Sequence, residues 1–404
     1  MDAVCVGNTI AKLRRKHGMT QADLAKKLNI SNKTVGRWEQ GLGYPEVTQF
    51  PQLAALFGVT VDLLMTGSRR GIAFAGNILA DVVKTIEHYP EAGMLCDILQ
   101  VSRSVGGCVP NTAIDMARID RAVPLAAIGR VGDDADGGFV VSQMQSYGID
   151  CSRVSVSKDV PTSFSDVMSL PSGERTFFHA RGANAAFSPQ DVDLDNVESQ
   201  ILHIGYILVL DAFDQPDEQY GTVMARFLHA AQHNGIKTSI DVVSREGADY
   251  KGKVLPALPY CHYVIINEVE SSMLFDLPPY DEQGKLLIDN IRQTAQRMAA
   301  CGVREKVIIH CKQAGFCYDV QTQSFTVVPS LLLDPQQIRG SVGAGDAFCA
   351  GCLYALYKGW DDEKMLAFAS GAAACNLFAD NAVDGMRSHE EIWKLIHSCQ
   401  RRTL

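Results

Sequence analysis

The stretch Gly340-Ser-Val-Gly-Ala-Gly-Asp-Ala-Phe-Cys-Ala-Gly351 places a loop of small residues, an aspartate and an apolar helical pattern in direct succession. The small residues let backbone N–H groups converge on one point, and the helical pattern that begins at Asp346 runs on to Gly359. A glycine loop that opens a helix binds anions, because unpaired amides and the helix dipole both favour negative charge. The stretch therefore predicts an anion hole made by Gly343, Ala344 and Gly345.

Asp346, beside this anion hole, has the chemistry of a general base. A carboxylate there can accept the proton of a substrate hydroxyl while that oxygen attacks the terminal phosphate of a nucleotide. The loop amides would then stabilise the charge that develops on the transferred phosphoryl group. Taken alone, the motif favours a helix that simply starts at a glycine turn, so further motifs must support the catalytic interpretation.

Short apolar runs alternate with longer helical patterns from residue 72 onward, which is typical of an α/β sheet flanked by helices. The runs include Ile72–Ala75, Leu125–Ile128, Ile201–Leu210, Thr238–Val242, Tyr263–Ile266 and Lys306–His310. The helical patterns include Asn111–Ile119, Tyr220–His233 and Lys285–Ala300. Two segments, about 82–104 and 162–180, break the alternation and predict a small β lid. The second reads as a hairpin around the turn at 171–174.

Five motifs in order resemble the ribokinase (pfkB) family of sugar kinases, over roughly residues 72–392. They are Gly76-x-x-x-x-Asp81, Gly106-Gly-Cys-Val-Pro-Asn111, Ile128-Gly-Arg-Val-Gly-Asp-Asp134, Gly173-Glu-Arg-Thr-Phe-Phe178 and Gly343-Ala-Gly-Asp-x-Phe-x-x-Gly351. The resemblance implies a ribokinase-like, mostly parallel sheet flanked by helices, with a small β lid. It also implies ATP-dependent phosphorylation of a hydroxyl of a small sugar, with ATP and Mg²⁺ as cofactors.

The same resemblance implies roles for individual residues. It makes Asp346 the catalytic base and the loop at 343–345 the anion hole. Substrate ligands would be Asp81, Gly106, Gly107 and Asn111, since carboxylate and amide groups together pair with hydroxyls that both donate and accept. The family's Asn-x-x-Glu, associated with Mg²⁺ and phosphate, corresponds to Asn267 and Glu270. A solvated acidic helix start is the alternative for this last pair.

Three further parts of the sequence match the family's motifs less closely or have no fixed role in them. Arg181 follows the lid hairpin, where it would contact a substrate or form a surface ion pair. The family's Thr-Leu-Gly-x-x-Gly near the nucleotide appears as His310-Cys-Lys-Gln-Ala-Gly315, so Gly315 is kept and Lys312 is gained. Lys312 would either alter adenine-nucleotide binding or place a cation beside the phosphates. Gly340 and Ser341 replace the family's Asp-Thr, which removes a carboxylate linked in relatives to a monovalent cation.

The N-terminal region contains two short helical patterns joined by a tight turn. Thr20 and Asp23 have the spacing of a capping box, and Ser31 can cap a second helix over 32–40. This is the helix-turn-helix arrangement, whose second helix can enter the major groove of DNA.

Residues 6–66 resemble the Cro-type (XRE-like) repressor domains. The resemblance rests on Thr20-Gln-Ala-x-Leu-Ala25, Ile30-Ser31, Thr34-Val-x-x-Trp-Glu-x-Gly41 and Phe57-Gly-Val-Thr-x-x-x-Leu64. It implies DNA binding by Gln21 and by the start of the second helix. There Asn32, Lys33 and Thr34 would meet bases or phosphates, and Arg37 would meet a phosphate. One module covers a half-site, so a homodimer is implied. A protein-interaction helix bundle is the alternative.

Charge and composition agree with a helix-turn-helix domain at 1–66, a linker at 67–71 and a kinase domain at 72–404. Of 37 Lys/Arg and 46 Asp/Glu, residues 1–70 hold ten and five, which leaves 27 and 41 for the remainder. A basic head on an acidic body suggests an anionic partner for the head alone. No run reaches the roughly 18 apolar residues of a membrane span, and no signal peptide is apparent. The twelve cysteines then predict reduced thiols in the cytoplasm.

Other functional classes can be set against this one. The P-loop motif and the Gly-x-Gly-x-x-Gly dinucleotide motif are absent. Cys349 and Cys352 form a C-x-x-C pair inside a predicted helix, where buried packing is the expected role. Two alternatives to a sugar kinase stay open: a sugar-sensing transcriptional regulator with a catalytically weak kinase fold, and a nucleoside kinase.

Overall fold

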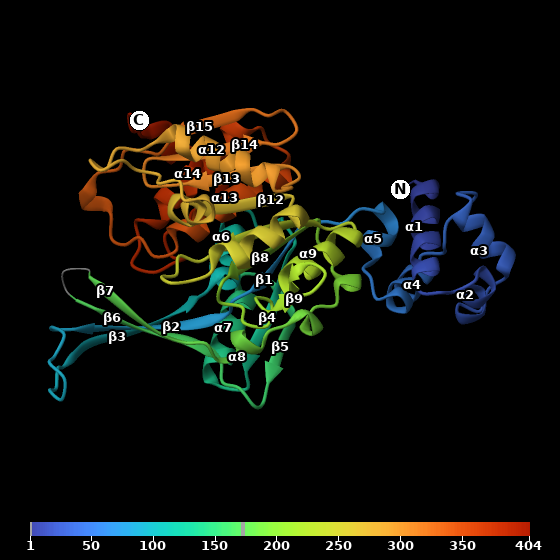
Figure 1. Cartoon of the computed structure of the whole chain (residues 1–404). Coiled ribbons are helices and arrows are strands. Elements are labelled where there is room, and N and C mark those ends of the chain that lie inside the picture. The colour runs from blue at the N-terminus through green and yellow to red at the C-terminus, as the bar shows by residue number, and fades with distance from the viewer. Residues whose placement is uncertain (1, 171–173) are drawn as a thin grey trace. The chain divides into compact units, whose positions relative to one another are not determined.

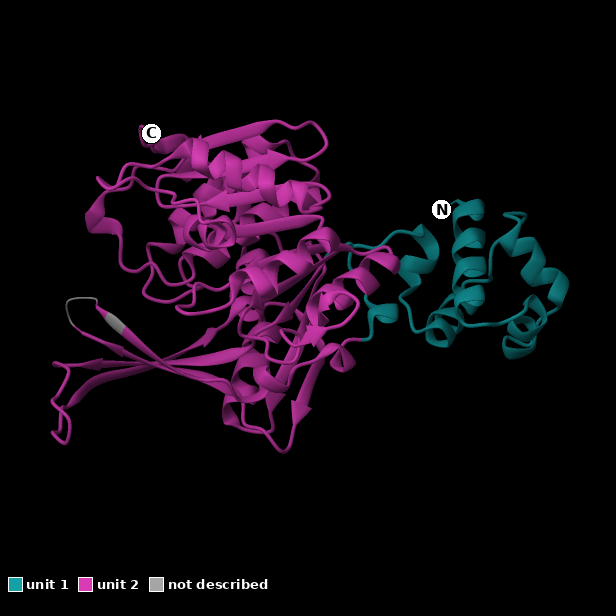
Figure 2. Ribbon diagram, in the orientation of Figure 1, with its two compact units in different colours: residues 1–71, 193–200 teal, residues 72–192, 201–404 magenta. Residues whose placement is uncertain are grey.

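The computed structural model describes residues 2–170 and 174–404, which form two compact units (Figure 2). The first comprises residues 1–71 and 193–200, and the second comprises residues 72–192 and 201–404. Residues 67–71 lie outside helices and strands. The segment 193–200 falls within the range predicted for the kinase domain, yet it belongs to the first unit, where Asp195 forms a 2.7 Å ion pair with Lys16.

The first unit contains five helices, α1 (Ala3–Lys16), α2 (Gln21–Lys27), α3 (Asn32–Glu39), α4 (Gln49–Phe57) and α5 (Val61–Thr66). Both predicted caps are confirmed. Thr20 forms the capping box with Asp23, and the Ser31 hydroxyl accepts the Thr34 N–H at 3.0 Å. These caps satisfy amides that have no partner within their own helix. The core of the unit includes Val6, Ile10, Leu24, Val35, Trp38, Leu53 and Phe57.

The second unit is built on a nine-stranded sheet in the order β15-β14-β13-β12-β11-β8-β1-β4-β5. The strands are β1 (Ile72–Gly76), β4 (Leu125–Gly132), β5 (Asp150–Ser157), β8 (Ile201–Ile207), β11 (Lys237–Val242), β12 (Tyr263–Asn267), β13 (Lys306–His310), β14 (Ala314–Asp319) and β15 (Phe325–Pro329). All pairings are parallel except those of β14 with β13 and β15. The interior strand β1 is buried throughout, as expected where helices cover both faces of a sheet.

Helices flank this sheet (Figure 1). They are α6 (Cys108–Ile119), α7 (Ala135–Ser146), α8 (Gly182–Ala186), α9 (Val223–His233), α10 (Tyr250–Val254), α11 (Glu268–Phe275), α12 (Ile288–Ala300), α13 (Ala344–Lys358), α14 (Asp362–Asn376) and α15 (His389–Ser398). The helix predicted from Asp346 is α13, which starts two residues earlier and ends, as predicted, at Gly359 in the left-handed conformation. A two-stranded ribbon, β9 (Pro216–Asp217) with β10 (Gly221–Thr222), completes the unit.

The predicted lid is a separate four-stranded sheet in the order β3-β2-β6-β7. Its strands are β2 (Leu79–Ile86), β3 (Ile98–Gly106), β6 (Ser163–Ser169) and β7 (Arg175–Ala180), and Figure 1 shows them extending away from the main sheet. The turn at 171–173, including Gly173 of the lid motif, lies outside the described residues. Within 2–170 and 174–404, no helix combines the length and apolarity needed to span a membrane.

Candidate active site

The carboxyl ends of the parallel strands carry polar side chains from several distant parts of the sequence. Strand β8 presents Tyr206, β11 presents Asp241 and β12 ends at Asn267. In open α/β sheets, ligands bind outside this edge of the sheet. Helices α6 and α13 begin beside it and add Asn111 and Asp346, which are linked by a hydrogen bond.

Asp346 lies in the first turn of α13 and is 6% exposed. Its Oδ1 accepts a hydrogen bond from the Tyr206 hydroxyl at 2.5 Å, and its Oδ2 accepts one from Asn111 Nδ2 at 2.9 Å. The structure therefore places the predicted base directly against the predicted substrate ligand Asn111.

Burial raises the pKa of Asp346 above its ordinary value, and the hydrogen bonds from Tyr206 and Asn111 oppose this rise. A carboxylate with a raised pKa is a stronger proton acceptor than an exposed aspartate, provided that it remains ionised at the working pH. The electrostatics of the site thus suit Asp346 to general-base chemistry.

Three residues of this site were not singled out from the sequence: Asn77, Tyr206 and Asp241. The Asn77 side-chain oxygen accepts the Tyr206 N–H at 2.9 Å, and the Asn77 N–H donates to the carbonyl of Gly205 at 3.0 Å. Asn77 thereby fixes the chain that carries the Tyr206 hydroxyl. Burial, followed by the charge of Asp346, raises the pKa of Tyr206, so the phenol stays a proton donor. Tyr206 sits inside an apolar strand pattern, and no periodic signal marks it.

The glycine pair before α6 allows close approach of backbone and side chains. A methyl group on Gly106 would collide with the Asp81 carboxylate, and one on Gly107 would collide with the Asn77 carbonyl. Gly107 also has φ +88°, a conformation that favours glycine. Asp81 on β2, the two glycines and Asn111 on α6 therefore form one continuous wall from the lid to Asp346.

The loop predicted as the anion hole has the backbone geometry of a tight turn. Gly343 is the N-cap of α13 at φ +78°, and a methyl group there would lie 2.6 Å from the Ala382 Cβ. A methyl group on Gly345 would lie 3.6 Å from His310 Cε1. Burial lowers the pKa of His310 to about 4, so this ring beside the loop is neutral.

Asn267 and Glu270 form a capping box at the start of α11, with backbone bonds of 2.8 and 3.0 Å. Ser244 links the two, since its hydroxyl donates to Glu270 at 2.8 Å and accepts from Asn267 Nδ2 at 3.0 Å. Glu270 is 5% exposed, and burial raises its pKa to about 7. The alternative of a solvated acidic helix start is therefore wrong for Glu270. Burial, reinforced by the Glu270 charge, also raises the pKa of Asp241.

The remaining candidate ligands lie in varied surroundings. Arg181 is paired with Asp211. Lys312 is exposed at the turn between β13 and β14. Gly315 lies on β14, where a methyl group would be 3.0 Å from Phe348 of α13, so this glycine serves packing in the described structure.

The helix-turn-helix unit presents only part of its predicted DNA-binding set to solvent. Asn32, Lys33 and Arg37 are exposed on α3, whereas Thr34 is half-buried with its hydroxyl 2.7 Å from that of Ser31. Gln21 donates to Glu39 at 2.8 Å, and Glu39 also accepts Arg14 at 2.6 Å.

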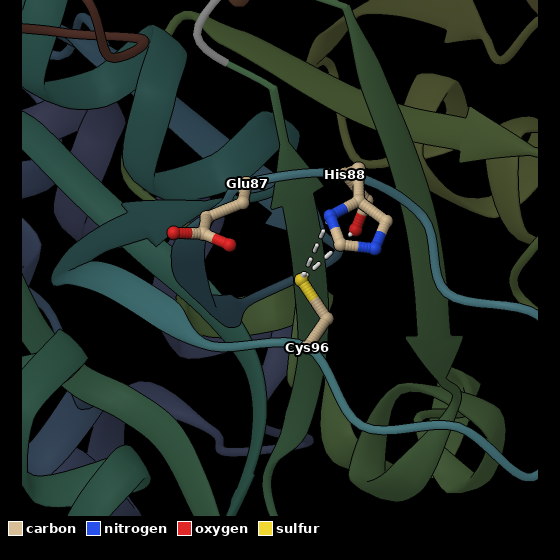
Figure 3. A group of neighbouring side chains, drawn as sticks. All are labelled: Glu87, His88 and Cys96. Carbon is tan, nitrogen blue, oxygen red and sulfur yellow. Dashed lines mark hydrogen bonds between the residues drawn. The ribbon is translucent and has the colours of Figure 1, made fainter.

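Away from this site, three side chains of types that can ligate a metal ion lie together on the loop that joins β2 to β3. They are Glu87, His88 and Cys96 (Figure 3). The Cys96 thiol donates to the His88 carbonyl at 3.1 Å and lies 3.9 Å from its Nδ1. This group is carried by the lid loop and contributes no residue to the site around Asp346. Cys349 and Cys352, by contrast, are buried in α13 as expected.

Comparison with known proteins agrees with this geometry. Residues 71–388 match the pfkB family carbohydrate kinases, and residues 10–64 match a helix-turn-helix family. A 5-dehydro-2-deoxygluconokinase from Clostridium perfringens is 24% identical over 326 residues, covering 80% of this chain and 91% of the relative.

Solved structures share the fold of the second unit. Arabidopsis thaliana ribokinase, complexed with ribose and ATP, is similar with a TM-score of 0.66 and 21% identity, over 81% of this chain and 99% of that one. A Methanocaldococcus jannaschii nucleoside kinase of the ribokinase family gives a TM-score of 0.61 and 18% identity, over 82% and 99%. The family match spans most of the chain and includes the wall, the glycine loop and Asp346. The chain therefore belongs to the pfkB family of ATP-dependent carbohydrate kinases, and a helix-turn-helix module of the Cro type precedes its kinase domain.

Proposed function

We propose that the chain transfers the terminal phosphoryl group of ATP to a hydroxyl of a small sugar or sugar acid, with Asp346 as the base. The observation that carries this proposal is the buried Asp346 carboxylate at the start of α13, hydrogen-bonded to both Asn111 and Tyr206. A sugar hydroxyl that enters between Asp346 and the wall of Asp81 and Asn111 replaces one of these donors and gives its proton to the carboxylate.

The residues at the strand ends fit a nucleotide with its magnesium ion. Asp241 and Glu270 offer buried carboxylate oxygens, the donors that Mg²⁺ prefers, close enough that the Glu270 charge raises the pKa of Asp241. When bound there, Mg²⁺ neutralises phosphate charge. The Gly343 and Gly345 amides at the start of α13 would serve the transferred group, whereas the Ala344 N–H donates to the Ser341 carbonyl at 3.3 Å.

The choice of substrate rests on the relatives. Several are named 5-dehydro-2-deoxygluconokinase, so a keto sugar acid heads the candidates, before ribose and other neutral sugars. The test is ATP consumption over a panel of sugar acids, sugars and nucleosides. Turnover on one sugar-class compound, lost in Asp346→Asn, is the expected result. Turnover on nucleosides alone would identify a nucleoside kinase, and none on any compound would favour a sensor.

For the first unit we propose sequence-specific DNA binding by a homodimer, in the cytoplasm, where ATP and DNA are both accessible. Exposed Asn32, Lys33 and Arg37 on α3 support it, since amide and cationic side chains recognise base edges and phosphates. We propose that Thr34 and Gln21 belong to the same DNA-binding surface. Selection of bound sequences from a random DNA pool tests this proposal. Recovery of a palindrome supports a homodimer, and recovery of no enriched sequence contradicts specific binding.

A further inference from the structure

A cavity of about 630 Å³ lies at the end of α6 remote from Asn111. Its lining residues are Arg118, Arg121, Tyr147, Met386, Arg387, Ser388 and Glu391. An adjoining hollow of about 410 Å³ shares Arg118, Arg121 and Ser388 with it, but is also lined by Asp120 and Glu390, so the excess of positive charge belongs to the larger cavity. This volume suits a small metabolite.

The cavity of about 630 Å³ is cationic, although the part of the chain that contains it is acidic. Residues 71–404 hold 27 Lys/Arg against 41 Asp/Glu, yet three arginines and one glutamate line this cavity. That glutamate, Glu391, already accepts hydrogen bonds from the Ser388 hydroxyl and N–H, at 2.8 and 3.0 Å.

Two of the arginines retain donors for a ligand. Arg121 is exposed and forms no hydrogen bond or ion pair with any residue that the structure describes. Toward the residues that the structure describes, Arg387 donates through Nη1 alone, to the carbonyls of Asp384 and Met386 at 3.3 and 3.4 Å. A guanidinium group carries five N–H donors, so most of those on this pair remain available.

We propose that this cavity binds a phosphate monoester as an effector distinct from the substrates. Guanidinium groups pair with phosphate through two parallel hydrogen bonds, a geometry that a lysine cannot reproduce. Tyr147 on the cavity wall supplies a hydroxyl for the organic part of the ester. The site lies at the opposite end of α6 from the Asn111–Asp346 contact, so both can be filled together.

The cavity is linked by direct contacts to the anion loop. Arg118 Nη1 donates to the Val383 carbonyl at 3.2 Å. The neighbouring residue, Ala382, packs so closely on Gly343 that a methyl group there would lie 2.6 Å from its Cβ. Arg118 also forms a 3.7 Å ion pair with Asp384, so it ties α6 to the segment 382–387 that carries Arg387. A phosphate held by Arg121 and Arg387 therefore restrains this segment, against which the loop packs, and effector and ATP affinities become coupled.

The experiment is isothermal titration of the full chain, with the catalytic site saturated by a non-hydrolysable ATP analogue. Inorganic phosphate, ribose 5-phosphate and AMP are titrated separately, which distinguishes free phosphate, sugar phosphate and nucleotide as the source of the ester. Wild type is compared with Arg121→Ala, with Arg121→Ala/Arg387→Ala and with Arg297→Ala. Arg297 is an exposed arginine on α12 outside the cavity, so its variant is the matched control.

At least one probe is expected to bind wild type and Arg297→Ala equally, and the double variant about tenfold or more weakly. Arg121→Ala, which removes an exposed side chain without bonding partners in the described residues, is expected to show an intermediate loss while folding normally. Equal affinity in all four proteins, or no binding of any probe to wild type, overturns the proposal. Because binding is measured without turnover, this result is independent of the assignment of Asp346.

Discussion

At the scale of single residues, the buried charge of Asp346 sets catalysis against stability. Burial raises the folded-state pKa of this carboxyl, so the ionised form costs folding free energy at every pH above that value. Asp346→Asn removes the charge. The unpaired side-chain oxygen of Asn111 can turn to accept the new amide, so the network stays complete.

We therefore expect Asp346→Asn to lower kcat by about 10²–10⁴-fold while raising the melting temperature at neutral pH. The stability gain should shrink as the pH falls toward the unfolded-state pKa of this carboxyl. Below that pKa, residue 346 is uncharged in the folded and the unfolded state of both proteins. Steady-state kinetics and calorimetry across pH measure the two effects. Asp289→Asn, at an exposed position on α12, is the control. A less stable Asp346→Asn protein would contradict a charge penalty at this site.

Tyr206 tests the identity of the titrating group. Its hydrogen bond lowers the pKa of Asp346, so Tyr206→Phe should raise that pKa further. The base must be ionised to accept a proton, hence the acid limb of kcat/KM should move to higher pH. A pH profile of the variant measures the shift, and an unmoved acid limb would mean that another group titrates.

The residue scale also marks what sequence can and cannot predict. Asp346 and Asn111 stand in motifs whose chemistry is evident, so they could be nominated together although 235 positions separate them. Tyr206 and Asn77 act through partners that meet only in the folded chain. Their positions are dictated by the packing of β1 against β8, which no local spacing reveals.

At the scale of elements, the turn that opens α13 places the strictest demand on residue type. Gly343 needs a positive φ and also has no room for a side chain, because Ala382 is in contact with it. Gly359, at the other end of the helix, has φ +70° and nothing within 4 Å of an added methyl group. Comparing substitutions at the two glycines therefore separates the effect of backbone strain from the effect of close contact with Ala382.

We expect Gly359→Ala to cost about 1 kcal/mol of stability and to leave kinetics unchanged. Gly343→Ala should cost more, and should raise the KM for ATP and lower kcat, because the anion loop must shift away from Ala382. Denaturant unfolding and initial-rate kinetics of both variants provide the comparison. Equal kinetics in the two variants would show that the loop geometry is not needed for phosphate binding.

Element prediction succeeded where burial imposed a pattern. The six apolar runs are all strands of the main sheet, since strands covered on both faces read as continuous apolar segments. The strands β5, β14 and β15 were not among the predicted runs. In β5 and β15, exposed or half-buried positions dilute the apolar signal. Helix α13 begins at Ala344 and not at Asp346 because Gly343, in the left-handed conformation, acts as its N-cap.

At the scale of the whole molecule, the division into units follows charge and connectivity only in part. Residues 1–70 are basic and the remainder acidic, as the counts indicate. The segment 193–200 nevertheless belongs to the first unit, where the Glu198 carbonyl accepts the N–H of Arg70 at 3.1 Å. A return of the chain across about 120 residues depends on tertiary packing, so composition cannot predict it.

The charge asymmetry leads to a prediction about DNA binding. If exposed cations on α3 neutralise phosphates, affinity for the selected DNA falls with salt, with a slope of log K against log salt of about 0.9 per phosphate contact. Lys33→Ala should weaken binding to all sequences and reduce the slope by about one contact. Asn32→Ala, which removes an uncharged side chain, should keep the slope and reduce discrimination between sequences.

The control is Lys394→Ala, which removes an exposed lysine on α15 of the kinase unit and should change neither the slope nor the discrimination. Fluorescence anisotropy over a salt series measures all three variants, and equal slopes for Lys33→Ala and wild type would show that this lysine contacts no phosphate.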